Sequence, residues 1–160
     1  MILEENYRKT TFEFKKMEFK LTSMARIYEV DKFKLHIKEL DMITSLIIGL
    51  EHRLEPVERS LDNLEWNGAE ERHDLEKKRL KLHDQLEDAH ELWCSINNRT
   101  ELVANYIEQY LSEQEAKEFH QLVRTRIKQI ATLRKTSHNI DALLRELKVF
   151  GDYEIAQVSF

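Results

Sequence analysis

The sequence has few of the residues that disulfide-rich, membrane-spanning and secreted proteins depend on. It holds one cysteine, one proline and three glycines among 160 residues. The single cysteine, Cys94, cannot form an internal disulfide and is typical of a reducing compartment. No segment approaches the ~18 consecutive apolar residues of a membrane span, and residues 1–30 lack the apolar core of a secretory signal. These absences indicate a cytoplasmic chain.

Motifs that carry enzyme chemistry are also missing. There is no glycine-rich phosphate loop, no cysteine pair and no zinc-binding histidine–glutamate motif. Among the seven histidines, His83 and His90 fall on one helical face, but two turns separate them, so a shared metal would need a third helix. The sequence therefore predicts no enzyme, no cofactor, and no catalytic, cofactor-binding or metal-binding residue.

The charge balance favours a protein partner. Charged residues make up 34% of the chain and hydrophobic residues 41%, a mixture typical of long helices with solvated outer faces. The formal net charge of −5 argues against nucleic acid or anionic lipid as the main partner, because both reward basic surfaces. A membrane-curving helical dimer is therefore a minor alternative, and membrane insertion is not expected.

A heptad pattern dominates what is present. Between Leu75 and Leu147 apolar residues recur at alternating steps of three and four, which keeps one stripe facing a partner helix. Four seam positions are polar and are candidates for fixing register or for exposure to solvent: Arg79, Thr100, Arg126 and Ser137. The positions that we expect to form a self-association seam are Leu82, Leu86, Trp93, Ile96, Val103, Ile107, Phe119, Val123 and Ile130.

Breaks in the pattern divide the chain. Residues 1–28 mix a period of two with a helical period, so we expect a divergent, weakly helical or irregular segment. A first long helix should begin near Asp31 and pass Pro56 with a kink rather than an end. Asn67-Gly68 predicts a turn before a second helix over residues 69–110.

The third helix has a clear start signal. Ser112 and Glu115 have the spacing of a capping box, and Gly151 suits a helix end near Phe150, with residues 151–160 as a flexible tail. We therefore expect an all-α fold in which residues 29–150 form three long helices of a segmented coiled coil. Short turns favour antiparallel neighbours. A straight continuation into another chain's helix is the alternative.

The order of three short motifs resembles one family. They are Arg53-Leu54 followed by Val57-Glu58, then Glu87-Asp88-Ala89, then Tyr110-Leu111-Ser112-Glu113. Together they are similar to the C-terminal conserved domain of the Shroom family over residues 30–148. Residues 1–28 do not resemble the helical lead-in of that family.

The resemblance implies a non-enzymatic scaffold. In the family this domain self-associates and binds the coiled coil of Rho-associated kinase, which it brings to apical cell junctions to drive actomyosin contraction and cell-shape change. Actin binding belongs to a separate region. The alternative is a structural self-associating coiled coil without kinase binding. The resemblance places partner binding on Leu50, Arg53, Leu54, Lys78 and Arg79.

Overall fold

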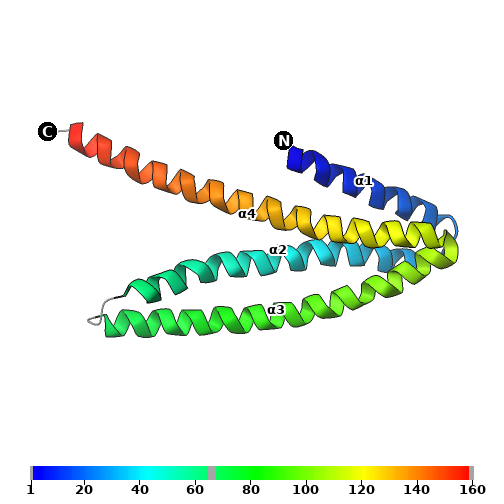
Figure 1. Ribbon diagram of the computed structural model, residues 1–160, viewed down its shortest axis with the longest axis horizontal. Coiled ribbons are helices and arrows are strands. Elements are labelled where there is room, and N and C mark those ends of the chain that lie inside the picture. Colours follow the sequence, from blue (N-terminus) through cyan, green and yellow to red (C-terminus); the bar gives the residue numbers. More distant parts are fainter. Residues whose placement is uncertain (1, 65–67, 159–160) are drawn as a thin grey trace.

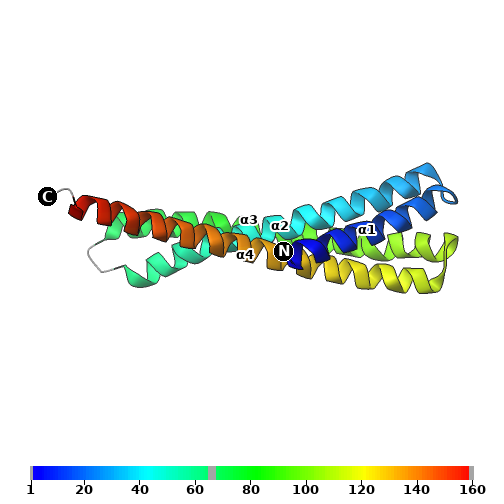
Figure 2. The same ribbon diagram turned by 90° about the horizontal axis from the view of Figure 1, so that it is seen from above.

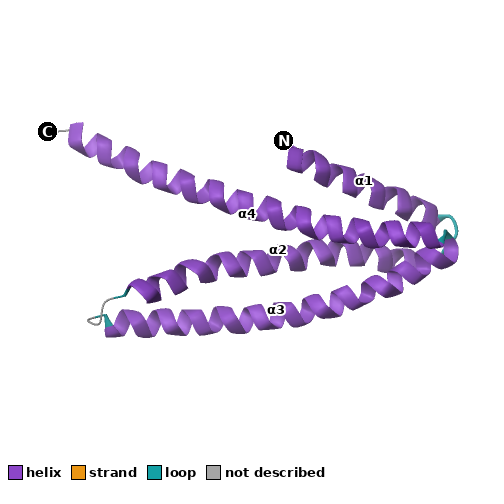
Figure 3. Cartoon of the chain, viewed as in Figure 1, coloured by secondary structure: helices purple, strands orange, loops and turns teal. Residues whose placement is uncertain are grey.

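The computed structural model describes residues 2–64 and 68–158, and every regular element within these ranges is helical. The helices are α1 (Ile2–Thr22), α2 (Ile27–Asn63), α3 (Ala69–Tyr110) and α4 (Glu113–Val158). Figure 3 shows a short loop between α1 and α2 and another between α3 and α4. The all-α prediction is confirmed, but there are four helices where we expected three.

The chain forms an elongated bundle whose two ends differ (Figure 1). At one end the α1–α2 and α3–α4 connections lie close together and all four helices meet. From there α2 leads away beside α3, and α1 lies along the first half of α4 (Figure 2). Toward its C-terminal end α4 moves away from α2 and α3. The bundle is therefore closed at one end and open at the other.

Helix α1 occupies the segment that we expected to be weakly helical or irregular. Its buried residues are Thr10, Phe14, Met17 and Leu21, which follow the 4–3–4 spacing of a helical stripe. The prediction missed this stripe because Phe12 and Phe19, which suggested a period of two, lie exposed on the other face. A threonine at the first stripe position also weakened the apolar signal.

Helix α2 begins at Ile27, slightly before the predicted start near Asp31. The backbone N–H of Arg26 donates to Glu29 Oε2 at 3.0 Å, which satisfies one of the amides that a helix start leaves unpaired. The helix then continues through Pro56 to Asn63. The prediction that Pro56 does not end the helix is confirmed.

The two later turns differ in how well they match the sequence pattern. Ser112 caps α4, because the Glu115 amide donates to Ser112 Oγ at 3.1 Å and the Ser112 hydroxyl donates to Glu115 Oε2 at 3.1 Å. Gly68 precedes α3, whereas Asn67 lies outside the described residues. Helix α4 passes Gly151 and reaches Val158, beyond the predicted end, because one glycine weakens a helix by only about 1 kcal/mol.

An aromatic cluster fills the four-helix end. The ring of Phe119 lies 6.2 Å from that of Phe14 and 5.8 Å from that of Phe33, measured between centroids. Phe33, Phe119 and Ile107 are among the most completely buried side chains. Three helices, α1, α2 and α4, thus contribute one phenylalanine each to the centre of this end.

The predicted seam lies inside this single chain. Its members Leu82, Leu86, Ile96, Val103, Ile107, Phe119, Val123 and Ile130 are buried, and Trp93 is partly buried against the core. Farther along α4, by contrast, Ile140 is 52% exposed and Leu144 58%. The stripe of α4 therefore loses its cover where this helix leaves α2 and α3.

Candidate partner-binding groove

A groove of about 840 Å³ brings together two of the residues to which the sequence assigned partner binding. Arg53 on α2 and Lys78 on α3 both line it, although 25 positions separate them in the sequence. Helix α4 supplies part of the lining through Asn139 and Arg145. The groove therefore depends on how three helices lie beside one another.

Positive charge dominates the groove lining. It includes five basic side chains and a single carboxylate, that of Glu55. The carboxylate of Glu55 pairs with Arg59 at 2.5 Å. Among the side chains of residues 2–64, 68–141 and 143–145, no carboxylate lies within 4.0 Å of the charged nitrogens of Arg53, Lys78 or Lys81. In a chain with a net charge of −5 this is a distinct basic surface. It suits an acidic partner. The five basic residues are Arg53, Arg59, Lys78, Lys81 and Arg145.

The other three predicted binding residues lie elsewhere. Leu50 and Leu54 are only 2% and 8% exposed, so in this fold they hold α2 in the core and position Arg53. Arg53 itself is exposed, and its Nε donates to the Gly49 carbonyl at 3.3 Å. Arg79 is exposed on α3 but is not among the groove-lining residues.

Sequence reasoning missed part of the groove. Lys81 is not among the residues that the family resemblance assigns, but it belongs to the basic patch that starts at Lys77, which the sequence alone marks as able to receive an acidic partner. Arg59 and Arg145 carry no comparable signal. Arg145 lies 67 positions beyond Lys78, and only the return of α4 places it in the groove.

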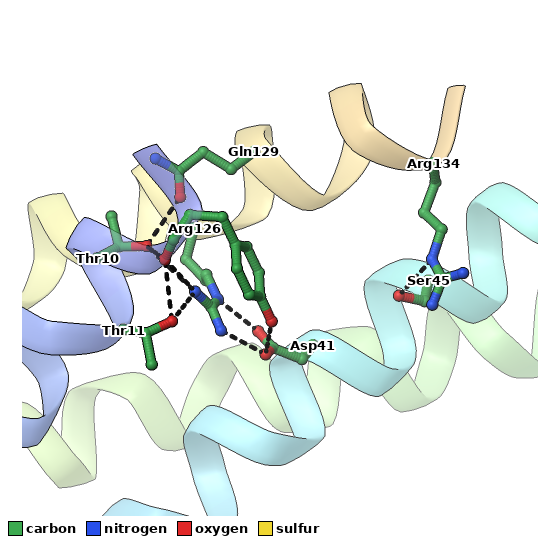
Figure 4. A network of polar contacts seen from close by, with 8 residues as sticks. Thr10, Thr11, Asp41, Ser45, Arg126, Gln129 and Arg134 are labelled. Carbon is green, nitrogen blue, oxygen red and sulfur yellow. Dashed lines mark hydrogen bonds and ion pairs between the residues drawn. The ribbon is translucent and has the colours of Figure 1, made fainter. Parts of the chain in front are cut away.

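A second polar cluster joins α1, α2 and α4 (Figure 4). The buried guanidinium of Arg126 donates from Nε to Asp41 Oδ1 at 2.9 Å and from Nη2 to Asp41 Oδ2 at 2.8 Å. Its Nη1 donates to the Tyr7 carbonyl at 3.0 Å and to Thr11 Oγ1 at 2.7 Å. The Tyr7 ring lies 3.5 Å from the guanidinium carbon. Arg126 therefore attaches α1 to the other two helices.

The remaining polar seam positions have different surroundings. Thr100 is buried and shares a 3.0 Å hydrogen bond with Nε2 of His36 on α2. Arg79 and Ser137 are exposed. Two of the four polar seam residues thus form specific contacts between helices, and two face solvent.

His36 predicts a pH-dependent stability. Burial, with the charge of Arg99, lowers the pKa of His36 from 6.5 to about 4. Below pH 6.5 the unfolded chain therefore binds a proton at this histidine that the folded chain does not bind, and the free energy of unfolding should fall by about 3 kcal/mol between pH 7 and pH 4.

Urea unfolding between pH 7 and pH 4 measures this effect. The variant His36→Gln keeps a hydrogen-bonding side chain but does not titrate, so its stability should depend less on pH over this interval. Equal pH slopes for the two proteins would contradict the role of His36.

Among the side chains of residues 2–64, 68–141 and 143–145, no three histidines, cysteines, aspartates or glutamates are grouped so that they could hold a metal ion. None of the described helical segments is long and apolar enough to cross a membrane. Cys94 is a free, exposed thiol. The groove is therefore the feature that best fits a functional site.

The fold and the groove define an elongated, all-helical domain with a basic groove on its surface. The family model described as Apx/Shroom domain ASD2 matches residues 2–152, and the chain belongs to this family. The match includes α1, whereas the motif resemblance covers only residues 30–148.

Curated relatives agree with this assignment. Protein Shroom2 of Xenopus tropicalis is 31% identical over 137 residues, which cover 85% of this chain and 8% of that protein. Protein Shroom3 of Xenopus laevis is 33% identical over 109 residues, or 68% of this chain and 6% of the relative. Protein Shroom of Drosophila melanogaster is 30% identical over 133 residues, which cover 83% of this chain and 8% of that protein. The chain thus spans less than a tenth of the length of these relatives.

Proposed function

We propose that this chain is the helical interaction domain of a Shroom-type cytoskeletal scaffold, and that it binds the coiled coil of Rho-associated kinase. Such binding would localise the kinase in the cytoplasm to apical cell junctions and the actomyosin cytoskeleton. The chain itself would catalyse no reaction. Membership of the Apx/Shroom ASD2 family supports the proposal. The structural observation that carries it is the presence of Arg53 and Lys78 in one basic groove.

Binding would depend on charge at the groove and on a rigid α2 beneath it. Arg53 and Lys78 would face carboxylates of the kinase, and Arg79 would extend the basic surface along α3. Leu50 and Leu54 would act indirectly, since they are buried. Replacing either leucine should therefore weaken kinase binding only to the extent that it also lowers the stability of the fold.

Arg53→Glu should weaken binding to a kinase coiled-coil fragment by at least about tenfold, because it replaces an attraction by a repulsion in the groove. Isothermal titration calorimetry measures the affinity, and circular dichroism should show unchanged helicity, since Arg53 is exposed. Arg124→Glu is the matched control, because it makes the same change at an exposed position of α4 outside the groove. Equal affinities of Arg53→Glu and the wild type would contradict the assignment.

A specific observation supports self-association as a second function. Ile140, Leu143 and Leu144 are exposed on the C-terminal half of α4. Burying them against a second copy would yield the segmented antiparallel coiled coil that the heptad pattern predicts. We therefore propose a homodimer. The alternative function is a structural dimer that does not bind the kinase.

Ile140→Asp combined with Leu144→Asp should shift the chain from dimer to monomer, because two charges would have to be buried at the interface. Light scattering measures the mass. The control is Phe19→Asp, which introduces a charge at an exposed position of α1. A monomeric wild type would contradict the homodimer, and a dimer that does not bind the kinase fragment would favour the structural alternative.

A further inference from the structure

We propose that the basic groove receives an acidic helix with carboxylates on successive turns, and that Arg59, Lys81 and Arg145 are specificity-determining residues beside Arg53 and Lys78. The proposal rests on the proposed function only for the identity of the natural partner. The chemistry of the occupant follows from the groove itself.

The first argument is the excess of charge. One carboxylate faces five basic side chains in the groove, and it is paired with Arg59. Elsewhere in the protein several basic residues have acidic partners, such as Arg99 with Glu39 at 2.7 Å and Lys34 with Glu18 at 3.6 Å. A groove in which the positive charges outnumber the negative ones in this way attracts an anionic ligand.

The second argument is the spacing of the basic residues. Arg53 and Arg59 are about 9 Å apart along the axis of α2, and Lys78 and Lys81 about 4.5 Å apart along α3. A single phosphate group could contact only the cations nearest to it. Acidic side chains at every third or fourth position of a helix recur about every 4.5–6 Å. One such step therefore matches the spacing of Lys78 and Lys81, and two steps of three residues match the roughly 9 Å between Arg53 and Arg59.

The third argument is the apolar part of the lining. Pro56 on α2 and Leu82 on α3 line the groove between the basic residues, and the side chain of Leu82 is largely buried. Alanine or leucine residues between the carboxylates of the ligand helix could pack there. This combination of apolar contact and surrounding charge is typical of a helix bound in a groove.

The α4 side of the groove is held by a contact with α2. The imidazole rings of His52 and His138 stack with their centroids 4.0 Å apart and their planes 9° apart. His52 and Asn139 both line the groove, so this stack fixes α4 next to it. It keeps Arg145, two turns beyond His138, within the same groove. A ligand that pairs with both Arg53 and Arg145 would connect α2 to α4.

The test uses a fluorescent helical peptide with glutamate at every fourth position and a second peptide with glutamine in its place. Fluorescence anisotropy should show that the glutamate peptide binds, that its affinity falls as salt is raised, and that the glutamine peptide does not bind. Arg145→Gln should weaken binding about fivefold, the effect expected for one exposed ion pair. Arg124→Gln, which changes an exposed arginine outside the groove, should leave it unchanged.

The outcomes separate this inference from the proposed function. Failure of the glutamate peptide to bind at low salt, or equal affinities of Arg145→Gln and wild type, overturns the inference. Binding of the kinase fragment that is insensitive to the triple variant Arg59→Gln, Lys81→Gln, Arg145→Gln also overturns it, although the proposed function then stands. Binding of the peptide but not of the kinase fragment supports the inference and contradicts the proposed function.

A second copy of the chain is the remaining candidate occupant. Helix α3 carries exposed acidic residues at Asp84, Glu87, Asp88 and Glu91, a spacing that the groove could accept. If a second copy filled the groove, Asp88→Lys would release it. The mass of the assembly measured in solution without peptide would then fall, and the affinity of the vacated groove for the peptide would rise. That result would overturn the assignment to a separate partner.

Discussion

Replacing Arg126 by alanine should lower the free energy of unfolding by about 3 kcal/mol, because the change leaves Asp41 and several acceptors of α1 without their donor. The guanidinium contacts α1 through the Tyr7 carbonyl and the hydroxyls of Thr10 and Thr11, and it contacts α2 through Asp41. The Arg126 side chain is almost completely buried, so water cannot replace these contacts in the intact fold.

Urea unfolding followed by circular dichroism measures the change. Hydrogen exchange should also accelerate over residues 2–22, because α1 loses its main polar attachment to α2 and α4. The double variant Arg126→Met with Asp41→Leu is the control: it removes both charges, so it should be less destabilised than Arg126→Ala. A loss below about 1 kcal/mol for Arg126→Ala would show that the cluster contributes little.

Phe119→Ala should destabilise the chain by about 3–5 kcal/mol, the usual cost of deleting a fully buried aromatic ring. Phe119 is 0% exposed and lies at the centre of the four-helix end, where its ring contacts those of Phe14, Phe33 and His36. Deleting it would leave a cavity between α1, α2 and α4 that rigid neighbouring helices cannot fill.

The matched control for Phe119→Ala is Phe19→Ala. Phe19 is among the most exposed large apolar residues of the chain, so the same substitution there should change stability by no more than about 0.5 kcal/mol. Thermal or urea unfolding compares the two variants directly. Similar losses for both would contradict the burial assigned to Phe119.

Several features of the fold could be predicted because they depend on residues close in sequence. The capping box needs only Ser112 and its neighbour three positions on, and the alternating spacing of the seam identifies helical faces without knowledge of their partners. Helix α1 could not be identified in this way. Its exposed phenylalanines and its buried Thr10 resemble neither a helical stripe nor a strand.

The groove shows the same limit. The family resemblance allowed Arg53 and Lys78 each to be proposed as a binding residue. Nothing in the sequence, however, indicated that the two residues line one surface together with Arg145. Likewise, Arg126 could be identified as a polar seam residue. Its partner Asp41 lies 85 positions earlier and has no local signal that relates the two.

By itself, the sequence determined the helices over residues 29–150, the faces that these helices bury, the capped start of α4 and the family to which the chain belongs. These properties follow from residue spacing within a few turns and from the order of short motifs. Only the tertiary structure decided that α1 joins the bundle, that Arg126 pairs with Asp41, and that the stripe of α4 is buried from Phe119 to Ile130 but exposed at Ile140 and Leu144. A heptad stripe requires a covering helix, but any apolar helix of suitable length satisfies it, so the choice depends on how the whole chain packs.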